Sequence, residues 1–234
     1  MDASESEQTI KPTDLRGILN YVPRFLGQTF VVALDGAIIE SDNLPNLLLD
    51  IAVLRSLQIN VVIVHGIGKQ LTDLSALREI IPSNTDGSGA TDGPTLDLAI
   101  RASSRVSHQI LEALTKAKLK CAITNSVKAK PVGVLKGIDL LNTGKTDKID
   151  ADFLAHLVAK NIIPIIQPIG FDRNGHTLRI NSDALAVDTA IALGATKILF
   201  LSEENGFIKD GRLTQQIPVA ELEEFVSAPN FSDY

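Results

Sequence analysis

FVVALDG at Phe30–Gly36 and VVIVHGIGK at Val61–Lys69 are the two stretches that decide the fold. Each is a run of β-branched apolar residues that ends in a turn containing glycine, which is typical of a buried parallel strand. Turns at the carboxyl ends of such strands usually bind phosphate or carboxylate groups. The first turn instead carries an acid, Asp35, with no Lys or Arg directly beside it. The sequence thus contains a phosphate-type turn that holds a carboxylate in place of a cation.

Segments with strand-like and helix-like spacing alternate along the whole chain. This alternation predicts a three-layer α/β/α sandwich with a mostly parallel central sheet and helices on both faces. Residues 1–12 are predicted to form a disordered tail, residues 13–28 an N-terminal helix, and residues 29–234 one α/β domain. We expect strands at 30–34, 60–64, 120–124, 162–167, 178–181 and 197–201, hairpins within 128–149 and 172–181, and helices at 14–25, 44–57, 70–80, 96–117, 152–160, 182–193 and 219–227.

The composition excludes several classes of protein. The chain has 234 residues and a net charge of −6, and no basic stripe is visible along it, which disfavours a nucleic-acid partner. A single cysteine, Cys121, excludes an internal disulfide and fits a reducing, cytoplasmic setting. No apolar run approaches the roughly 18–20 residues that cross a bilayer, so a membrane protein is not expected. The four histidines are scattered without metal-ligand spacing, and we expect no metal.

The turn His65–Lys69 follows a strand and precedes a helix, so its backbone N–H groups can point at an anion. It fails as a dinucleotide fingerprint, because Leu71 stands at the third glycine position, and it fails as a Walker loop, because no Ser or Thr follows the lysine. Two interpretations stay open: a tight connection without a ligand, or a binding turn. His65 by itself is expected to be a structural or capping residue. The candidate binding residues are Gly36, Gly66, Ile67 and Gly68.

A second candidate segment, Arg179–Asp183, leaves a predicted strand and opens a predicted helix. Asn181 or Ser182 would cap that helix, and Asp183 would lie in its first turn, where a carboxylate is favoured by the helix dipole. Capping alone explains these residue types; the alternative is that Asn181 and Asp183 position a ligand. The turn at residues 202–207 carries two acids, makes a poor phosphate cradle, and is expected to be solvated.

Taken in order, these motifs resemble those of the amino acid kinase family over about residues 14–226. Members of that family have strands ending K-x-G-G and V-H-G-G-G-P, an N-x-N-A-D segment, and a strand ending L-T-D-V-x-G-V. The corresponding stretches here are Ala33–Gly36, Val64–Lys69, Arg179–Asp183 and Leu201–Phe207. Gly144–Asp150 resembles the G-R-x-x-x-I-D stretch of N-acetylglutamate kinase and of the kinase-like domain of N-acetylglutamate synthase. The resemblance therefore implies an amino acid kinase-like fold, nearest to these two proteins.

This chain differs from the family pattern at several positions to which the resemblance assigns a catalytic role. The lysine that stabilises the transferring phosphoryl group is Ala33 here, and the first glycine of that turn is Asp35. The middle glycine of the second turn is Ile67, whose side chain is expected to crowd the site. The arginine that holds a substrate carboxylate is absent from Gly89–Asp92, and Arg179 replaces the first Asn of N-x-N-A-D. The carboxylate of Asp35 would repel a triphosphate, and the missing lysine would leave the transition state without a donor. Together these changes predict that the rate of phosphoryl transfer falls by several orders of magnitude, so no catalytic residue is expected.

The resemblance also bears on assembly. Tyr21–Phe25 resembles the extra N-terminal helix of arginine-regulated kinases and synthases, in which this helix builds hexamers and a tyrosine matching Tyr21 contacts arginine. The family's C-terminal nucleotide-binding portion and the synthase's acetyltransferase domain are expected to be missing after Tyr234, and part of the arginine site with them. These likenesses predict a homo-oligomer, either a dimer or a hexamer, with at most a small amino-acid-like ligand.

Three functional hypotheses follow. The leading one is a kinase-like regulatory and oligomerisation domain of an amino-acid N-acetyltransferase, N-acetylglutamate synthase, in arginine biosynthesis, without phosphoryl transfer. The second is a working acetylglutamate kinase, which would require ATP and Mg²⁺ and would use another cation such as Lys69. The third is a non-catalytic interaction protein whose pocket is closed by Asp35 and Ile67. No cofactor is expected under the first and third hypotheses, and acetyl-CoA would enter only with an acetyltransferase domain.

Overall fold

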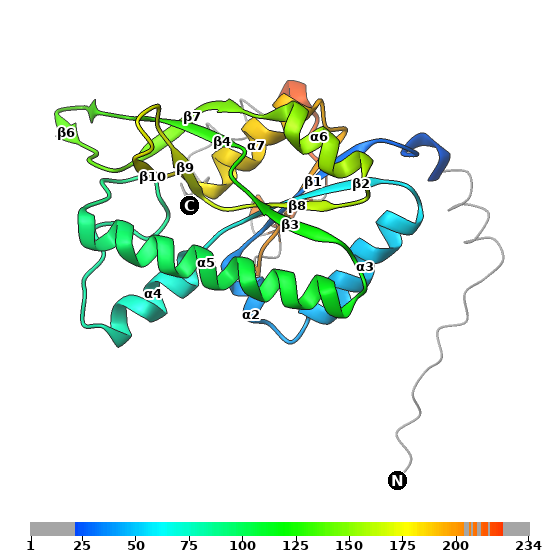
Figure 1. Cartoon of the computed structure of the whole chain (residues 1–234), viewed down its shortest axis with the longest axis horizontal. Coiled ribbons are helices and arrows are strands. Elements are labelled where there is room, and N and C mark those ends of the chain that lie inside the picture. Colours follow the sequence, from blue (N-terminus) through cyan, green and yellow to red (C-terminus); the bar gives the residue numbers. More distant parts are fainter. Residues whose placement is uncertain (1–21, 204–205, 207, 210–211, 215, 222–234) are drawn as a thin grey trace, which may run out of the picture. The chain divides into compact units, whose positions relative to one another are not determined.

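Figure 1 shows the computed structural model of the chain, which describes residues 22–203, 206, 208–209, 212–214 and 216–221. The chain divides into two compact units, Met1–Leu201 and Ser202–Tyr234. The predicted tail, most of the predicted N-terminal helix and the candidate Tyr21 lie outside the described residues. Of that helix, Val22–Arg24 form a short 3-10 helix, η1.

The first unit is built on a five-stranded sheet in which all neighbouring strands pair in parallel. Its order is β11-β1-β2-β8-β3, so the two stretches that decide the fold lie side by side. Ala33 pairs with Phe200 on one side and with Val64 on the other. The strands are β1 (Thr29–Leu34), β2 (Asn60–His65), β3 (Cys121–Thr124), β8 (Ile163–Ile166) and β11 (Lys197–Leu201).

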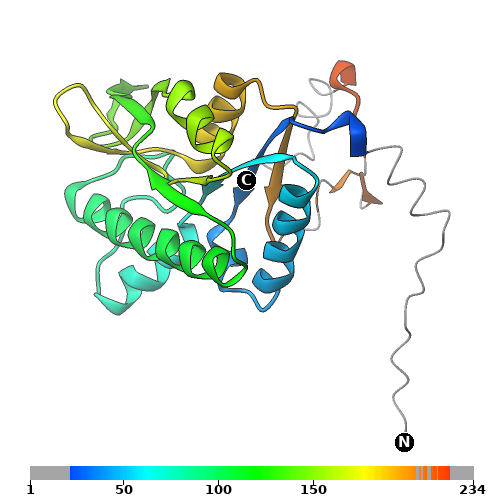
Figure 2. The ribbon, with the colours of Figure 1, turned by 45° about the vertical axis from the view of Figure 1, so that its right-hand side comes forward.

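Helices cover both faces of this sheet, which confirms the predicted sandwich (Figure 1, Figure 2). Successive side chains of a strand point to opposite faces, so Val32 and Leu34 join one core cluster while Val31 and Ala33 join the other. The first cluster lies under α2 (Gly36–Glu40), α3 (Leu44–Ser56), α4 (Gly68–Leu77) and α5 (Gly93–Lys116), and the second under α6 (Ala151–Ala159) and α7 (Ser182–Leu193).

A second, smaller sheet packs into the α6–α7 side of the core, and it confirms the hairpins expected at 128–149 and 172–181. Gly170 is needed in it, because a Cβ there would lie 2.7 Å from the Cβ of Ala129. The strands, in the order β10-β9-β4-β7, are β4 (Val127–Pro131), β7 (Gly144–Ile149), β9 (Ile169–Phe171) and β10 (Thr177–Arg179), and the small pair β5 (Val134–Leu135) and β6 (Ile138–Asp139) lies between β4 and β7 in the chain.

Two differences from the predicted elements bear on the site. Helix α2 was not predicted, and α4 begins at Gly68 instead of residue 70, inside the glycine turn itself. In the second unit, β12 (Ile208–Lys209) and β13 (Arg212–Leu213) form an antiparallel pair, and Val219–Glu221 form a 3-10 helix, η2, at the start of the predicted last helix. Among the described helices, none has the length and apolar character needed to cross a membrane.

Candidate functional site

The carboxyl ends of β1 and β2 meet the amino end of α7, and these three termini form the candidate site. The N–H of Gly66 donates to the carbonyl of Leu34 at 2.7 Å, which holds the two strand ends together. A Cβ on Gly66 would lie 3.3 Å from Ser182 Oγ and 3.5 Å from Gly36 N. Sequence positions far apart in the chain are thus within a few ångströms of each other, as the strand-end pattern predicts.

Asp35 at the end of β1 has a structural role of its own. Its carboxylate accepts a hydrogen bond from Ala37 N at 3.0 Å and thereby caps α2. An Asp at this position is a favoured N-cap, because it satisfies one of the free N–H groups of the first turn. The acid that disturbs the phosphate-type pattern is therefore explained locally as the start of the unpredicted helix.

Asn181 and Asp183 open α7 on the other side of the strand ends. The Asn181 side-chain oxygen accepts from the N–H groups of Asp183 at 3.1 Å and Ala184 at 3.0 Å, which confirms the predicted cap. Partial burial raises the pKa of Asp183, and the nearby charge of Asp35 raises it further. Two carboxylates consequently act on each other across the carboxyl ends of the strands, and no ion pair to either is found within the described residues.

Ile67 does not crowd this site as expected. Its side chain is 3% exposed and belongs to the core cluster beneath α2, α4 and α5, with Leu34 and Leu71. Gly68 begins α4, and a Cβ on it would lie 3.8 Å from the carbonyl oxygen of Thr85. The side chain of Ile67 is therefore part of the packed interior, while the two glycines beside it remain half-buried.

Lys69, at the end of the second glycine turn, forms ion pairs with two acidic side chains. Its Nζ lies 2.9 Å from a carboxylate oxygen of Asp73, one turn along α4, and 3.7 Å from one of Glu40. The hydrogen bond and charge of Asp73 raise the pKa of this lysine, so it stays protonated. Its positive charge is thus already neutralised by two neighbouring carboxylates.

Gln70 belongs to the site although its sequence position gave no signal. The side chain is 4% exposed, and its Nε2 donates to the carbonyl of Gly36 at 2.7 Å. A Cβ on Gly36 would collide with the amide oxygen of Gln70, so a larger residue there would force the Gln70 amide to move. That oxygen has no hydrogen-bond partner among the described residues. Gln70 is the third residue of α4, and its reach to Gly36 becomes visible only in the folded chain.

Arg179 is almost fully buried, at 1% exposed, and its role was not predicted. Its guanidinium donates to the carbonyls of Asn84 (3.0 Å) and Thr85 and to the Asn84 side-chain oxygen (3.1 Å). Asn181 Nδ2 holds the same loop through the carbonyl of Asp86 at 3.0 Å. Burial lowers the pKa of Arg179, and the charge of Asp86 opposes that effect. Arg179 therefore fastens the loop before α5 to the segment that opens α7.

His65 is structural, as its sequence context suggested. The ring is fully buried, and its Nε2 lies 2.7 Å from Ser107 Oγ while its Nδ1 lies 3.1 Å from the carbonyl oxygen of Gly66. Burial lowers the pKa of His65 to about 4, with the hydrogen bond to Gly66 acting in the opposite direction. At neutral pH the imidazole is uncharged and joins β2 to α5.

The other positions at which the family carries functional residues have structural roles in this chain. Ala33, at the position of the family's lysine, is 6% exposed and packs in the cluster that contains Leu185 and Ala186 of α7. Gly89–Asp92, where the family carries an arginine, are held by polar contacts such as that from Thr143 Oγ1 to the carbonyl of Gly89. Within the described residues there is no cluster of His, Cys, Asp or Glu that could hold a metal ion.

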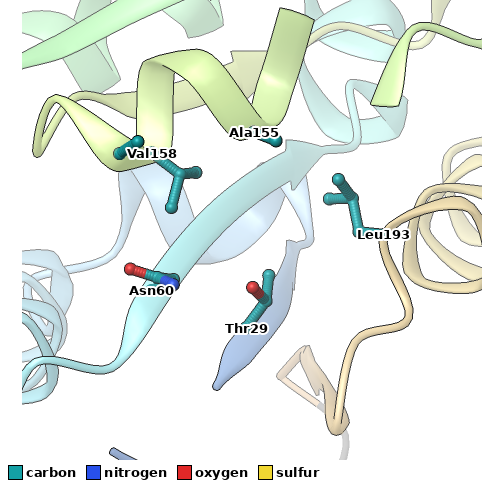
Figure 3. Close-up of a pocket in the computed structure, with 6 residues that line it drawn as sticks. Thr29, Asn60, Ala155, Val158 and Leu193 are labelled. Atoms are coloured by element: carbon teal, nitrogen blue, oxygen red, sulfur yellow. The ribbon is translucent and has the colours of Figure 1, made fainter. Parts of the chain in front are cut away.

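A cavity of about 200 Å³ lies elsewhere, at the amino ends of β1 and β2 (Figure 3). Thr29 and Asn60 begin these strands, so the cavity is at the opposite end of the sheet from Asp35 and Gly66. Ligands of open α/β sheets bind at the carboxyl ends of the strands, and we therefore place the candidate site there. The cavity is lined by Thr29, Asn60, Ala155, Val158, Ala159 and Leu193.

Comparison with known proteins agrees with this geometry. The chain is 30% identical over 213 residues to an amino-acid acetyltransferase of Ralstonia nicotianae, a match that covers 87% of this chain and 47% of the relative. It is 33% identical over 216 residues to an acetylglutamate kinase of Pseudothermotoga lettingae, covering 89% and 76%. The chain thus spans about half the length of the acetyltransferases that it matches.

A solved structure of N-acetylglutamate synthase from Neisseria gonorrhoeae, complexed with coenzyme A and L-arginine, superposes with a TM-score of 0.83 at 26% identity. That superposition covers 90% of this chain and 52% of the synthase. The model of the amino acid kinase family matches residues 28–231, which include the whole central sheet and every element of the candidate site. The chain therefore belongs to the amino acid kinase family.

Proposed function

We propose that this chain is the kinase-like regulatory and oligomerisation domain of an N-acetylglutamate synthase and does not transfer phosphoryl groups. The observation that carries the proposal is that Ala33 stands at the position of the family's lysine, while Asp35 adds a negative charge close enough to raise the pKa of Asp183. The likeness to amino-acid acetyltransferases and to the solved synthase supports it.

The charges of the site argue against a triphosphate. Like charges about 4–6 Å apart repel by roughly one to several kcal/mol near a protein surface. Loss of one transition-state donor typically costs about 2.7–4 kcal/mol more. Ala33 supplies no cation, and Lys69 is held by Asp73 and Glu40. The residues present therefore do not fit ATP and Mg²⁺, and no catalytic step is assigned to them.

The same charges suit a small amino-acid-like ligand. The carboxylates of Asp35 and Asp183 repel each other, and an ammonium or guanidinium group bound between them would relieve this repulsion. Calorimetry against arginine, glutamate, N-acetylglutamate, acetyl-CoA and ATP distinguishes the hypotheses. Heat with arginine or glutamate and none with ATP supports the regulatory domain. No heat with any of the five favours a pure interaction protein.

The direct test of the proposal is an ADP-release assay with N-acetylglutamate, ATP and Mg²⁺. We expect no turnover above the rate of a protein-free control. Turnover above about 1 s⁻¹, in the ordinary range for enzymes, would overturn the proposal.

The alternative is a working acetylglutamate kinase. It is favoured by the match to an acetylglutamate kinase over 76% of that protein and by Asn181 and Asp183, which keep the family's residue types. Such an enzyme needs a cation, and Lys69 would have to leave its acidic partners. A measured activity that Lys69→Ala abolishes and Lys160→Ala leaves unchanged would support this alternative.

A further inference from the structure

The outward face of the β4–β7 ribbon carries four lysines in two directly opposed pairs. The pairing register places Lys128 opposite Lys148 and Lys130 opposite Lys145. Directly opposed residues of an antiparallel pair project from the same side. Alternate residues such as Val127 and Ala129 are buried, while the four lysines are exposed. We call Lys128, Lys130, Lys145 and Lys148 the lysine face.

This arrangement works against the stability of the ribbon, because like charges directly opposite each other on a sheet are destabilising. Asp147 relieves part of the repulsion: it lies 2.9 Å from the Nζ of Lys130 and 4.0 Å from the guanidinium of Arg173. For Lys128 and Lys148, no carboxylate lies within ion-pair distance in the part of the chain that the structure describes. A concentration of charge that the local fold does not need points to a partner.

The charge contrast with the rest of the chain is large. Residues 127–149 contain five lysines and two acids, a net charge of +3, so the remaining residues carry −9 of the total of −6. The sequence did not reveal a basic patch, because the lysines alternate with buried residues and meet only when the ribbon folds. On the neighbouring strand β9, Phe171 is the register partner of Lys128 in the backbone ladder, and it is 41% exposed.

We propose that the lysine face binds an acidic segment of a partner polypeptide, with an apolar side chain of that segment resting on Phe171. Several closely spaced carboxylates are complementary in charge to these ammonium groups, of which Lys130 alone already has a carboxylate partner within ion-pair distance among the described residues. The face is the outer surface of a sheet, which offers an extended chain more contact than it offers a small anion.

The test uses the full chain and a fluorescein-labelled hexaglutamate peptide that carries one phenylalanine. Fluorescence anisotropy at low ionic strength should show binding that weakens as salt is added. Lys128→Glu/Lys148→Glu should weaken the affinity about tenfold or more, because two attractions become repulsions. The control Lys118→Glu/Lys120→Glu makes the same change of net charge at an exposed site away from the ribbon, and it should change the affinity less than about twofold.

Three outcomes would overturn the proposal: absence of peptide binding at low salt, an equal loss of affinity in both double variants, or tighter binding of a short single-stranded DNA than of the peptide. If the double variant misfolds, a second measurement still tests the geometry: the melting temperature of the single variant Lys148→Glu. Because it turns a like-charge pair into an ion pair with Lys128, its melting temperature should rise at low salt. A fall would show that the two side chains are not opposed, and the geometry on which the proposal rests would be wrong.

Discussion

Replacement of His65 by glutamine should remove an acid-dependent loss of stability from this fold. The imidazole is fully buried between β2 and α5. Its Nδ1–H donates to the carbonyl of Gly66, so Nε2 accepts from the hydroxyl of Ser107, which in turn accepts from Gln167 Nε2 at 2.9 Å. This network satisfies both nitrogens of the neutral ring, whereas a charged ring would be buried without a carboxylate partner among the described residues.

The size of the effect follows from the pKa of His65, which burial lowers from 6.5 to about 4. Above pH 6.5 the ring is neutral in both the folded and the unfolded chain, and no penalty exists. Between pH 6.5 and about 4 the unfolded chain binds a proton that the folded chain rejects, so the free energy of unfolding falls as the pH falls. The total loss is roughly 3 kcal/mol, and it levels off below about pH 4.

Urea unfolding of the wild type and of His65→Gln, measured at several pH values from 7 to 4, tests this reasoning. Glutamine keeps a donor and an acceptor but has no proton to gain, so the stability difference between the two proteins should shrink as the pH falls. Carboxylates that titrate in the same range are common to both proteins and cancel. The control Thr115→Gln introduces a glutamine at an exposed position of α5 without removing a titrating group, and it should run parallel to the wild type. A parallel curve for His65→Gln would refute the assignment.

Four other predictions test the site and the assembly. Arg179→Met should lower the free energy of unfolding by at least about 2 kcal/mol in urea titrations, because the carbonyls of Asn84 and Thr85 lose their donors; an unchanged midpoint would refute its fastening role. Ile67→Gly, which restores the family residue, should cost about 3–5 kcal/mol by the same assay, since it empties a core position. Asp35→Asn keeps a good cap for α2 and should lower the pKa of Asp183 in an NMR titration; an unshifted pKa would mean that the two carboxylates do not interact. Deletion of residues 1–26 should lower the oligomer order measured by light scattering, and an unchanged mass would contradict the proposed role of the N-terminal helix.

The sandwich was predictable because its signals are local. β1 and β2 are β-branched runs between polar segments, and the strand and helix periods alternate along the chain without conflict. Once parallel pairing is accepted, the carboxyl ends of β1 and β2 must share one edge of the sheet, so Asp35 and Gly66 could be grouped from the sequence. The opening of α7 follows β10 of the smaller sheet, and its place beside them depends on the folded structure. The family pattern then located the departures residue by residue.

The missed features depend on contacts between distant segments. Arg179 looked like a substitution in a motif, and nothing in its neighbourhood in the sequence indicates that its guanidinium reaches carbonyls 94 and 95 residues away. Helix α2 has five residues, too few for a 3.6-residue period to show, and Asp35 could be identified as its cap only when the helix was seen. The lysine face arises from a register between strands with a bulge at Lys128/Ala129, which sequence spacing does not reveal.

Each departure from the kinase pattern has a structural role in this chain. Ala33 fills space beneath α7, Asp35 caps α2, and Ile67 adds a buried side chain to the core. In a kinase the corresponding lysine and glycines keep a site open and charged, and they contribute little to the stability of the fold. Ala33 and Ile67 add apolar packing and Asp35 adds a helix cap, and none of the three supplies a cation. These structural roles support the proposed regulatory and assembly domain over the alternative of an enzyme with a rearranged active site.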